Sequence, residues 1–445
     1  MARIRLSEHF TYGKLLRFVM PSIMMMIFTS IYSVVDGLFV SNFVGKTPFA
    51  AINLIAPVTM VLSAFGFMAG TGGTAIIGKT LGEKKTEEAN RYFSLIIYTV
   101  MIGSVVLAAV GLLVLGPLAA ALGATGSLLD NSLLYGRVTF LALPFFMLQV
   151  TFQSFFAAAE KPTLGLGVTV ISGVTNIVMD ALFIIVFEWG LYGAAFATAL
   201  SQVAGAVIPV VYFALPNDSL LRLTAKTKCY PAILWKMCTN GSSEMVSNLA
   251  SSLIGLLYNY QLMRLLGENG VAAYGILMYV GFIFAAVNFG YVMGFAPAVS
   301  FQYGAGNDRE LGNLFSKSIL LMSAAGIVMF LTARLLARPM AVIFVSYDVE
   351  LLELTVYAFH IFAFEFLTNG LNTFASAFFT ALNDGKVSAI LAVVRTFLCK
   401  TVSILWLPVV WGVDGIWGAT AVAEAVSLLV TIFFLVRKRK KYHYA

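Results

Sequence analysis

The chain has 445 residues, of which 60% are hydrophobic and only 11% are charged, with a mean hydropathy of +0.90 and a formal net charge of +7. This composition excludes an ordinary soluble domain and predicts an all-α polytopic membrane protein. The apolar runs are long and continuous, which excludes the two-residue alternation of an outer-membrane barrel.

Turn residues and charges divide the apolar runs into twelve predicted transmembrane helices. The predicted spans are 18–42, 51–78, 92–116, 131–158, 163–187, 192–214, 237–264, 271–303, 317–340, 354–381, 387–410 and 416–436. An even number of spans places both termini on the same side. The first span is long enough to cross a bilayer and no small-residue cleavage site follows it, so no signal peptide is expected.

The first span carries a carboxylate in an apolar surrounding. Asp36 lies within PSIMMMIFTSIYSVVDGLFVSNFV, residues 21–44, and Tyr32 precedes it by one helical turn, within hydrogen-bonding reach. An ionised aspartate in a bilayer costs several kcal/mol, so such residues usually face a protein interior or a watery cavity and serve transport or proton relay. The alternative is a helix end in the headgroup region. Asp36 is therefore the first candidate functional residue.

The fifth and sixth spans supply partners at the same expected depth. Asn176 and Asp180 are four residues apart and share one helical face, and Thr198 lies a short way into the sixth span. Counted from the outer helix ends, Asp36, Asp180 and Thr198 lie at a similar depth of about 10 Å. Together these four side chains predict an oxygen-rich pocket for a hard cation such as Na⁺, or a carboxylate pair that holds a proton. Helix-to-helix hydrogen bonding is the alternative for Asn176 and Thr198.

The fourth span and the start of the first suggest a substrate surface. Gln149 and Gln153 are expected to add polar lining, and Met26 and Phe152 belong to a set of methionines and aromatic residues. Flexible methionines and aromatic faces suit varied lipophilic cations. Packing between helices or contact with lipid explains each of these residues equally well.

The second half lacks a counterpart of this acidic cluster but carries other charges in or near its spans. Glu365 and Glu424 are expected to line a cleft and attract cationic substrate. A structural ion pair with Arg395 or Lys400 is the alternative, because an unpaired buried charge is costly. Glu244 follows a basic loop closely and is expected near the cytoplasmic surface.

Basic residues predict the orientation in the membrane. They are concentrated on the side of both termini, which predicts cytoplasmic termini and explains the net charge without a nucleic-acid partner. The basic tail RKRKK is expected to contact anionic membrane lipids. Basic residues on the cytoplasmic side are Arg3, Arg5, Lys14, Arg17, Lys79, Lys84, Lys85, Arg91, Lys161, Arg222, Lys226, Lys228, Lys236, Arg309, Lys317, Lys386 and 437–441; those opposite are Lys46, Arg137, Arg264, Arg334 and Arg338.

The chain also repeats itself with a shift of about 222 to 225 residues. FAAINL and the following GKTLGEKKTEEANRYFS are echoed by VAAYGI and QYGAGNDRELGNLFS, and WGLYGAAFATALSQ is echoed by VDGIWGATAVAEAVS. We therefore expect two pseudo-symmetric six-helix bundles around a central cleft, the geometry that alternating access requires. The expected parts are an N-terminal lobe (1–215), a cytoplasmic linker (216–236), a C-terminal lobe (237–436) and a basic tail (437–445).

These motifs resemble those of the multidrug and toxic compound extrusion (MATE) family, in the bacterial branch of the DinF and MepA types. The resemblance rests on Pro21 and Asp36, on LGEKKTEEA after the second span and on YGAGNDRE after the eighth, and it covers nearly the whole chain. It implies a secondary active antiporter of the bacterial inner membrane that exports cationic organic compounds in exchange for H⁺ or Na⁺. It also implies that Asp36, Asn176, Asp180 and Thr198 form the cation site. We expect a monomer without a cofactor.

Other function classes fit the sequence less well. A flippase for lipid-linked precursors shares the wider superfamily, but a pyrophosphate would require a more cationic cleft. A channel would need a filter segment, and none is recognisable. A membrane enzyme would need a nucleophile with a base or a set of metal ligands, and neither the three histidines nor the three cysteines suggest one.

Overall fold

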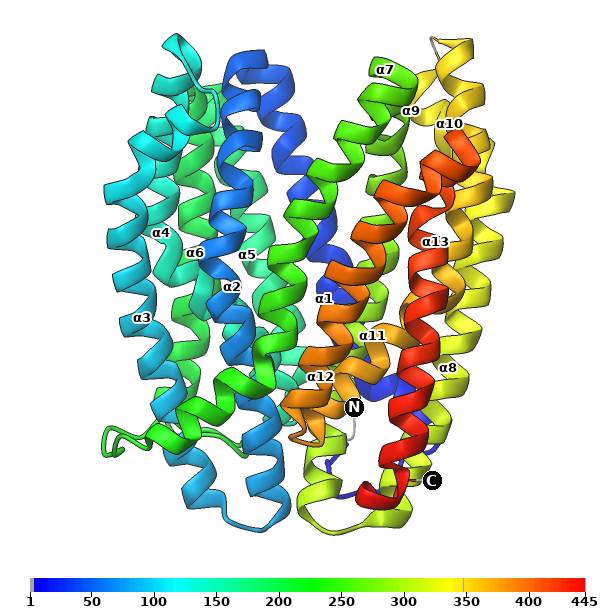
Figure 1. Ribbon diagram of the computed structural model, residues 1–445. Helices are drawn as coiled ribbons and strands as arrows, with labels where there is room; N and C mark the ends of the chain where they lie inside the picture. The colour runs from blue at the N-terminus through cyan, green and yellow to red at the C-terminus, as the bar shows by residue number, and fades with distance from the viewer. Residues whose placement is uncertain (1–3, 347, 445) are drawn as a thin grey trace.

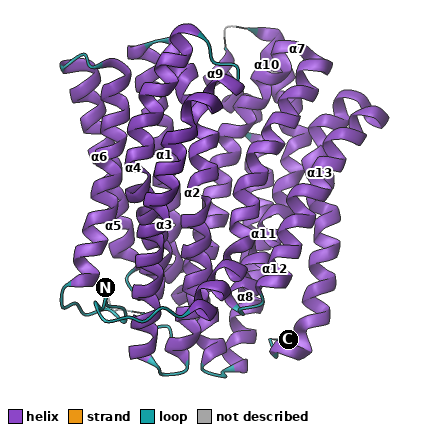
Figure 2. Cartoon of the chain, turned by 60° about the vertical axis from the view of Figure 1, so that its left-hand side comes forward, coloured by secondary structure: helices purple, strands orange, loops and turns teal. Residues whose placement is uncertain are grey.

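The computed structural model describes residues 4–346 and 348–444, and helices make up nearly all of it (Figure 2). Within the described residues, ten helical runs are long and apolar enough to cross a membrane. Two of these runs contain a single glycine with a positive φ angle, Gly267 (62°) and Gly412 (55°), at which the helix breaks and turns back. The ten runs therefore correspond to the twelve predicted spans, and the predicted fold class is confirmed.

The first half of the chain forms one group of helices, and both termini of the chain lie at the same end of the molecule (Figure 1). Short π-helical segments, labelled η, extend α1 and α5. The elements are α1 Tyr12–Phe39, η1 Val40–Val44, α2 Lys46–Gly82, α3 Thr86–Ala121, α4 Gly126–Ala158, α5 Pro162–Asp180, η2 Ala181–Val186 and α6 Gly190–Ala214.

The second half forms a second group beside the first (Figure 1). Gly267 divides α7 and Gly412 divides α13, and η3 is a 3₁₀ segment whereas η4 is π-helical. The elements are α7 Pro231–Gly304, α8 Asp308–Leu335, α9 Ala337–Val345, α10 Val349–Phe362, η3 Ala363–Glu365, α11 Phe366–Ala381, α12 Gly385–Ala392, η4 Val393–Cys399 and α13 Lys400–Tyr442.

Several helix ends differ from the predicted boundaries. The sequence predicts a ninth span over 317–340, but α8 ends at Leu335 and the separate short helix α9 follows. The guanidinium of Arg338 in α9 donates to Glu353 of α10 at 2.7 Å, so this charge is satisfied outside a spanning helix. The predicted linker 216–236 is also too long, because α7 already begins at Pro231, where the missing N–H of proline costs no helical hydrogen bond.

Each half has its own apolar core. In the first half, the rings of Phe93, Phe152 and Phe213 pack together, and Phe152 stacks on Phe213 with ring centres 5.7 Å apart. In the second half, Tyr258 and Trp417 are fully buried in a separate cluster. Aromatic pairs of this kind contribute about 0.5–1.5 kcal/mol each beyond the burial of their area. A third cluster joins the halves, because Phe18 and Val19 of α1 pack with Phe295 of α7.

The halves touch backbone to backbone at the end that carries the termini. A Cβ atom at Gly72 of α2 would lie 2.1 Å from the carbonyl oxygen of Met237 in α7, and one at Gly82 would lie 2.0 Å from that of Phe301. Only glycine allows so close an approach. We call these contacts the glycine seal, and they close the space between the halves on the side of the termini.

The N-terminal segment ties the two halves together across the same end. The Leu6 N–H donates to Glu160 at the end of α4 at 2.7 Å, while the Leu6 carbonyl accepts from Gln302 of α7 at 2.7 Å. His9 Nδ1 lies 2.6 Å from the buried Glu310 of α8. The segment before α1 is therefore a strap that spans both halves.

The C-terminal tail is fixed at the same end of the second half. The Tyr442 hydroxyl donates to Asp384 at 2.6 Å, and the ammonium groups of Lys438 and Lys441 lie 3.5 and 3.7 Å from the same carboxylate. Burial alone would raise the pKa of Asp384, but the Tyr442 hydrogen bond and the two lysines outweigh it and hold the pKa below its usual value. The basic tail thus binds Asp384 of the same chain, in addition to the anionic lipid that its sequence suggests.

The glycine seal yields a first prediction. Gly82→Ala inserts a methyl group against the Phe301 carbonyl, so the two halves must separate at this end, at a cost of about 1–3 kcal/mol for overpacking. In a variant without native cysteines, spin labels at Lys85 and Arg309 should report a longer and broader distance distribution after this substitution. Gly167→Ala in α5, whose Cβ meets nothing within 4 Å, is the control. Equal distributions in both variants would contradict the proposed seal.

Candidate functional site

Asp36 lies near the outer end of α1, just before the helix changes its hydrogen-bonding pattern. The Val40 N–H donates to the carbonyls of both Asp36 and Gly37, and the π-helical segment η1 follows. The aromatic ring of Tyr32, one turn earlier, packs against Gly173 of α5, which holds α1 close to α5. π-helical turns recur at functional sites because they interrupt the regular helix and re-aim its side chains.

The second carboxylate also lies near the end of its helix, next to a π-helical segment. Asp180 is the last residue of α5, directly before η2, and it is fully buried. Asn176, one turn earlier on the same face, is also buried. The side chains of Asp180 and Asn176 both lie beside the Asp36 carboxyl group. The structure thus brings together three of the residues that the sequence suggested.

The neighbouring helix α6 carries two more polar side chains of the same kind. Thr198 and Gln202 are one turn apart on α6, and each has a buried side-chain oxygen without a hydrogen-bond partner. Within the described residues, seven buried polar atoms of this group have no hydrogen-bond partner of good geometry. They are Asp36 Oδ1, Asn176 Nδ2 and Oδ1, Asp180 Oδ1 and Oδ2, Thr198 Oγ1 and Gln202 Oε1.

Such a concentration of unsatisfied oxygen atoms is chemically suited to a small cation or a proton. Neither carboxylate forms an ion pair with a described basic side chain. A buried carboxylate must be paired, coordinated or protonated, because an isolated charge in a low-dielectric interior is costly. No described group of three or more His, Cys, Asp and Glu residues could hold a metal ion. Two carboxylates with amide and hydroxyl oxygens instead suit a hard monovalent cation or a shared proton.

Two further residues are candidates for this site that the sequence did not single out. Gln202 lies four residues after Thr198, and this spacing was a usable signal. Tyr135 of α4 is buried and lies close enough to Asp36 and Asp180 to sense both charges. Nothing in the sequence near Tyr135 indicates that α4 turns this face toward α1 and α5.

Three of the predicted substrate-cleft residues pack inside the first half instead. Gln149 donates to Ser172 at 3.2 Å and wedges against Gly205, and Gln153 faces Thr169 at 3.4 Å. Phe152 is fully buried in the aromatic cluster described above. These residues were expected to line a cleft, and in this structure they join helices. Met26 is half-buried on α1.

The two glutamates expected in the cleft are paired with cations. Arg395 Nε lies 2.9 Å from both oxygens of Glu424, and Lys400 Nζ lies 3.1 Å from Glu424 and 3.6 Å from Glu365. Glu424 is fully buried and also accepts from Asn372 at 2.8 Å. This geometry matches the ion-pair alternative, and a role toward substrate stays a prediction.

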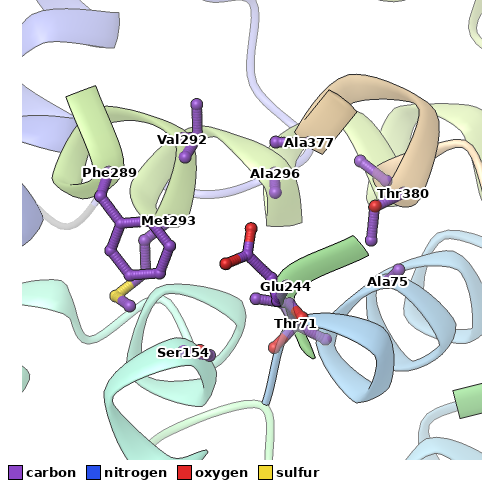
Figure 3. Close-up of a pocket in the computed structure, with 12 residues that line it drawn as sticks. Thr71, Ala75, Ser154, Glu244, Phe289, Val292, Met293, Ala296, Ala377 and Thr380 are labelled. Atoms are coloured by element: carbon purple, nitrogen blue, oxygen red, sulfur yellow. The ribbon is translucent and has the colours of Figure 1, made fainter. Parts of the chain in front are cut away.

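A small cavity lies between the two halves, and Glu244 projects into it (Figure 3). The expectation that Glu244 sits near the cytoplasmic surface is therefore wrong: the first part of α7 carries it up into the molecule. Phe289 and Met293 form the apolar wall opposite (Figure 3). The other lining residues come from α2, α4, α7 and α11 and are Thr71, Thr74, Ala75, Ser154, Val292, Ala296, Ala377, Thr380 and Ala381.

Comparison with protein-family models identifies the family to which this architecture belongs. The MatE family model matches residues 21–182 and again residues 245–406, one match in each half. The chain belongs to the MatE family. Members of this family are transporters and not enzymes, and the double match confirms the internal repeat that the sequence predicted.

Individual proteins agree with this assignment. The chain is 23% identical over 434 residues to the multidrug export protein MepA of Staphylococcus haemolyticus, covering 98% of this chain and 95% of that protein. It superposes on a crystal structure of a MATE protein in complex with MaL6 with a TM-score of 0.92 at 20% identity, covering 99% and 98% of the two chains. An outward-facing multidrug resistance MATE transporter gives a TM-score of 0.91 at 21% identity, covering 98% and 97%. These structural matches establish the MATE fold.

The missed residue Gln202 provides a second prediction. Gln202→Leu removes one oxygen donor from the cation site, so we expect affinity for Na⁺ or for the shared proton to fall about tenfold, equivalent to about 1.4 kcal/mol. Calorimetric titration with Na⁺ and proton-uptake measurements on the purified protein test both ions. Gln153→Leu is the matched control, because Gln153 is buried in the same half but bonded to Thr169. A similar loss of affinity in the two variants would remove Gln202 from the site.

Proposed function

We propose that this MATE protein is a secondary active antiporter that exports cationic organic compounds in exchange for H⁺ or Na⁺ by alternating access. The observation that carries the proposal is the pair of carboxylates formed by the partly buried Asp36 and the fully buried Asp180, which lack a basic partner among the described residues. Such a pair is stable only while it holds a mobile cation or proton, and it can therefore exchange one. The relatives named multidrug export proteins support export of small molecules as the direction of transport.

The first step of the proposed cycle is neutralisation of the carboxylate pair. An ion that enters from the outer side reaches Asp36 and Asp180, where Asn176, Thr198 and Gln202 offer further oxygen ligands. Na⁺ here is cargo, held by the same oxygens that could share a proton. Loss of the negative charge removes the repulsion between the carboxylates and allows α1 and α5 to pack differently at their π-helical ends.

The second step concerns the organic substrate. Glu244 supplies one negative charge to the cavity between the halves, and the other lining residues are uncharged. Phe289 and Met293 offer an aromatic face and a flexible side chain to a lipophilic cation. Repacking of α1 after ion binding would then change the cavity between the halves and weaken the hold on the substrate.

The orientation and surroundings of the transporter follow from charge. The end that carries both termini also holds the basic loops after α2 and α6 and the basic tail, which supports a cytoplasmic position for this end in a bacterial inner membrane. The glycine seal lies at this end, so the structure is closed toward the cytoplasm. We expect a monomer in contact with anionic lipid and without a nucleic-acid partner.

The acidic cavity argues against the flippase alternative. A lipid-linked pyrophosphate needs basic groups at its binding site, whereas the charged residue that lines the cavity is Glu244. A multidrug exporter of organic cations needs the opposite polarity, which this cavity has.

Ion coupling is tested with Asp36→Asn in proteoliposomes. We expect the variant to lose pH- or Na⁺-gradient-driven uptake of a fluorescent organic cation by about tenfold or more, the loss expected when about 1.4 kcal/mol of coupling disappears. Imposing each gradient separately identifies the coupling ion in the unaltered protein. Gradient-driven uptake at the original rate in Asp36→Asn would exclude this carboxylate from coupling.

Substrate binding is tested separately with Glu244→Gln. Removing the charge should weaken binding of a lipophilic cationic dye about tenfold, while binding of an uncharged dye of similar shape should change less than twofold, because only the cation gains from the carboxylate. Fluorescence titration of the purified protein measures both affinities. Glu353→Gln, at an exposed site paired with Arg338, is the control. An equal change for both dyes would show that Glu244 shapes the cavity without selecting for charge.

A further inference from the structure

The charged side chains that cluster in the second half neutralise one another, unlike the two carboxylates of the first half. Glu365 and Glu424 contribute two negative charges, and Arg395 and Lys400 contribute two positive charges within 3.6 Å of them. The side chain of Glu424 is fully buried, whereas the side chains of Arg395 and Lys400 are each 15% exposed. The cluster therefore needs no additional ion to be stable inside the membrane.

The internal repeat relates the two sites to each other. The two segments matched by the family model begin 224 residues apart, and this shift places Lys400 at the position of Asn176. Asn176 lies beside Asp36 in the cation site of the first half. A π-helical segment accompanies each site, since η2 directly follows Asp180 and η4 ends directly before Lys400. A basic side chain in one half thus stands where the other half has a neutral ligand of its cation site.

We propose that the Lys400 ammonium group is a built-in cation. In the second half it replaces the mobile cation that the first half binds. The proposal rests on the proposed function for the meaning of the N-terminal site, but it concerns different residues. Because the second half carries its own cation, only the first half exchanges one during transport. Lys400 thereby limits the number of ions exchanged per cycle.

The surroundings of Lys400 could accept a mobile cation if the ammonium group were removed. Without it, the cluster has one excess negative charge, and the buried oxygen Oε2 of Glu365 already lacks a hydrogen-bond partner. The hydroxyl groups of Thr368, Thr401 and Thr420 are also buried without partners. Carboxylate and hydroxyl oxygens are suitable ligands for Na⁺, and the carboxylate alone can take a proton.

Other titratable groups near the cluster must be separated from this effect. Tyr258 and Tyr274 of α7 lie near Glu365, but tyrosine hydroxyls ordinarily titrate near pH 10 and stay neutral below pH 8. Glu244 of α7 faces Arg395 across the interior. His360 lies at the end of α10, five residues before Glu365 of η3, and its imidazole is removed in the experiment below so that it cannot contribute.

The experiment uses the full-length protein with the first site disabled by Asp36→Asn and Asp180→Asn and with His360→Gln. Lys400→Gln is added to this background, and melting temperatures are compared at about pH 8 and about pH 5, and with and without Na⁺. The measured quantity is the difference between the variant and its background under each condition, which cancels titration of Glu244 and of groups elsewhere. We expect Lys400→Gln to melt at least several degrees lower at the higher pH without Na⁺, and at least half of this loss to return on acidification or on addition of Na⁺.

Two control variants test the charge count. Lys400→Arg keeps the built-in cation and should show no restoration by protons or Na⁺. The double variant Lys400→Gln with Glu365→Gln is neutral again and should also show none, while melting higher than Lys400→Gln at about pH 8.

A loss of melting temperature that neither protons nor Na⁺ restore would overturn the proposal, because Lys400 would then be only a packing or pairing residue. If Lys400→Gln fails to fold at the higher pH, recovery of folded protein at about pH 5 or in the neutral double variant supports the proposal, and recovery in neither overturns it. Since the first site is disabled and transport is not measured, these outcomes are independent of the antiport test on Asp36.

Discussion

A buried charge inside a membrane protein must be neutralised, and this constraint determines the arrangement of both halves. The first half places two carboxylates, Asp36 and Asp180, side by side without a basic partner, so their charge is stable only with a bound proton or cation. The second half neutralises Glu365 and Glu424 with its own basic side chains. In the proposed function, one repeat therefore depends on an external ion and the other does not. This asymmetry within a symmetric fold is what an ion-driven transporter needs, because one half can change charge while the other keeps its structure.

The described π-helical segments all lie next to buried charged residues. Segment η1 begins four residues after Asp36, η2 begins directly after Asp180, and η4 contains Arg395. A π-helical turn weakens the regular hydrogen-bond ladder and leaves the backbone able to adopt a second pattern at low cost. The two acidic helices are thus least regular where their charge would change during ion exchange. Elsewhere, close aromatic packing and glycine contacts hold the helices rigidly.

The sequence predicted the twelve spans, the repeat and the acidic residues well, because hydrophobic length and the cost of buried charge are strong local signals. It also placed Asn176 and Asp180 on one helical face, although the role of this group as an ion site stays a prediction. The sequence could not show that Phe152 and Gln149 pack inward, because only tertiary contacts decide which face of an apolar helix meets a neighbour. Glu244 was misplaced for a related reason: its nearness to a basic loop suggested the surface, but α7 begins early and carries it to the cavity.

Helix α1 connects the ion site to the contact between the halves. Its outer part carries Asp36, whereas its inner part lies against α7, where a Cβ at Gly290 would be 2.5 Å from the Cα of Ile23 and one at Gly294 would be 3.0 Å from that of Val19. These contacts leave no free space between α1 and α7. A displacement of α1 near Asp36 must therefore either bend the helix or shift α7. Pro21 lies within this contact region and already lacks one helical hydrogen bond, which makes bending there less costly. The strap before α1 adds a second connection, because Leu6 binds both halves. A change of charge at the two carboxylates can therefore reach α7, which forms one side of the glycine seal, through one continuous helix.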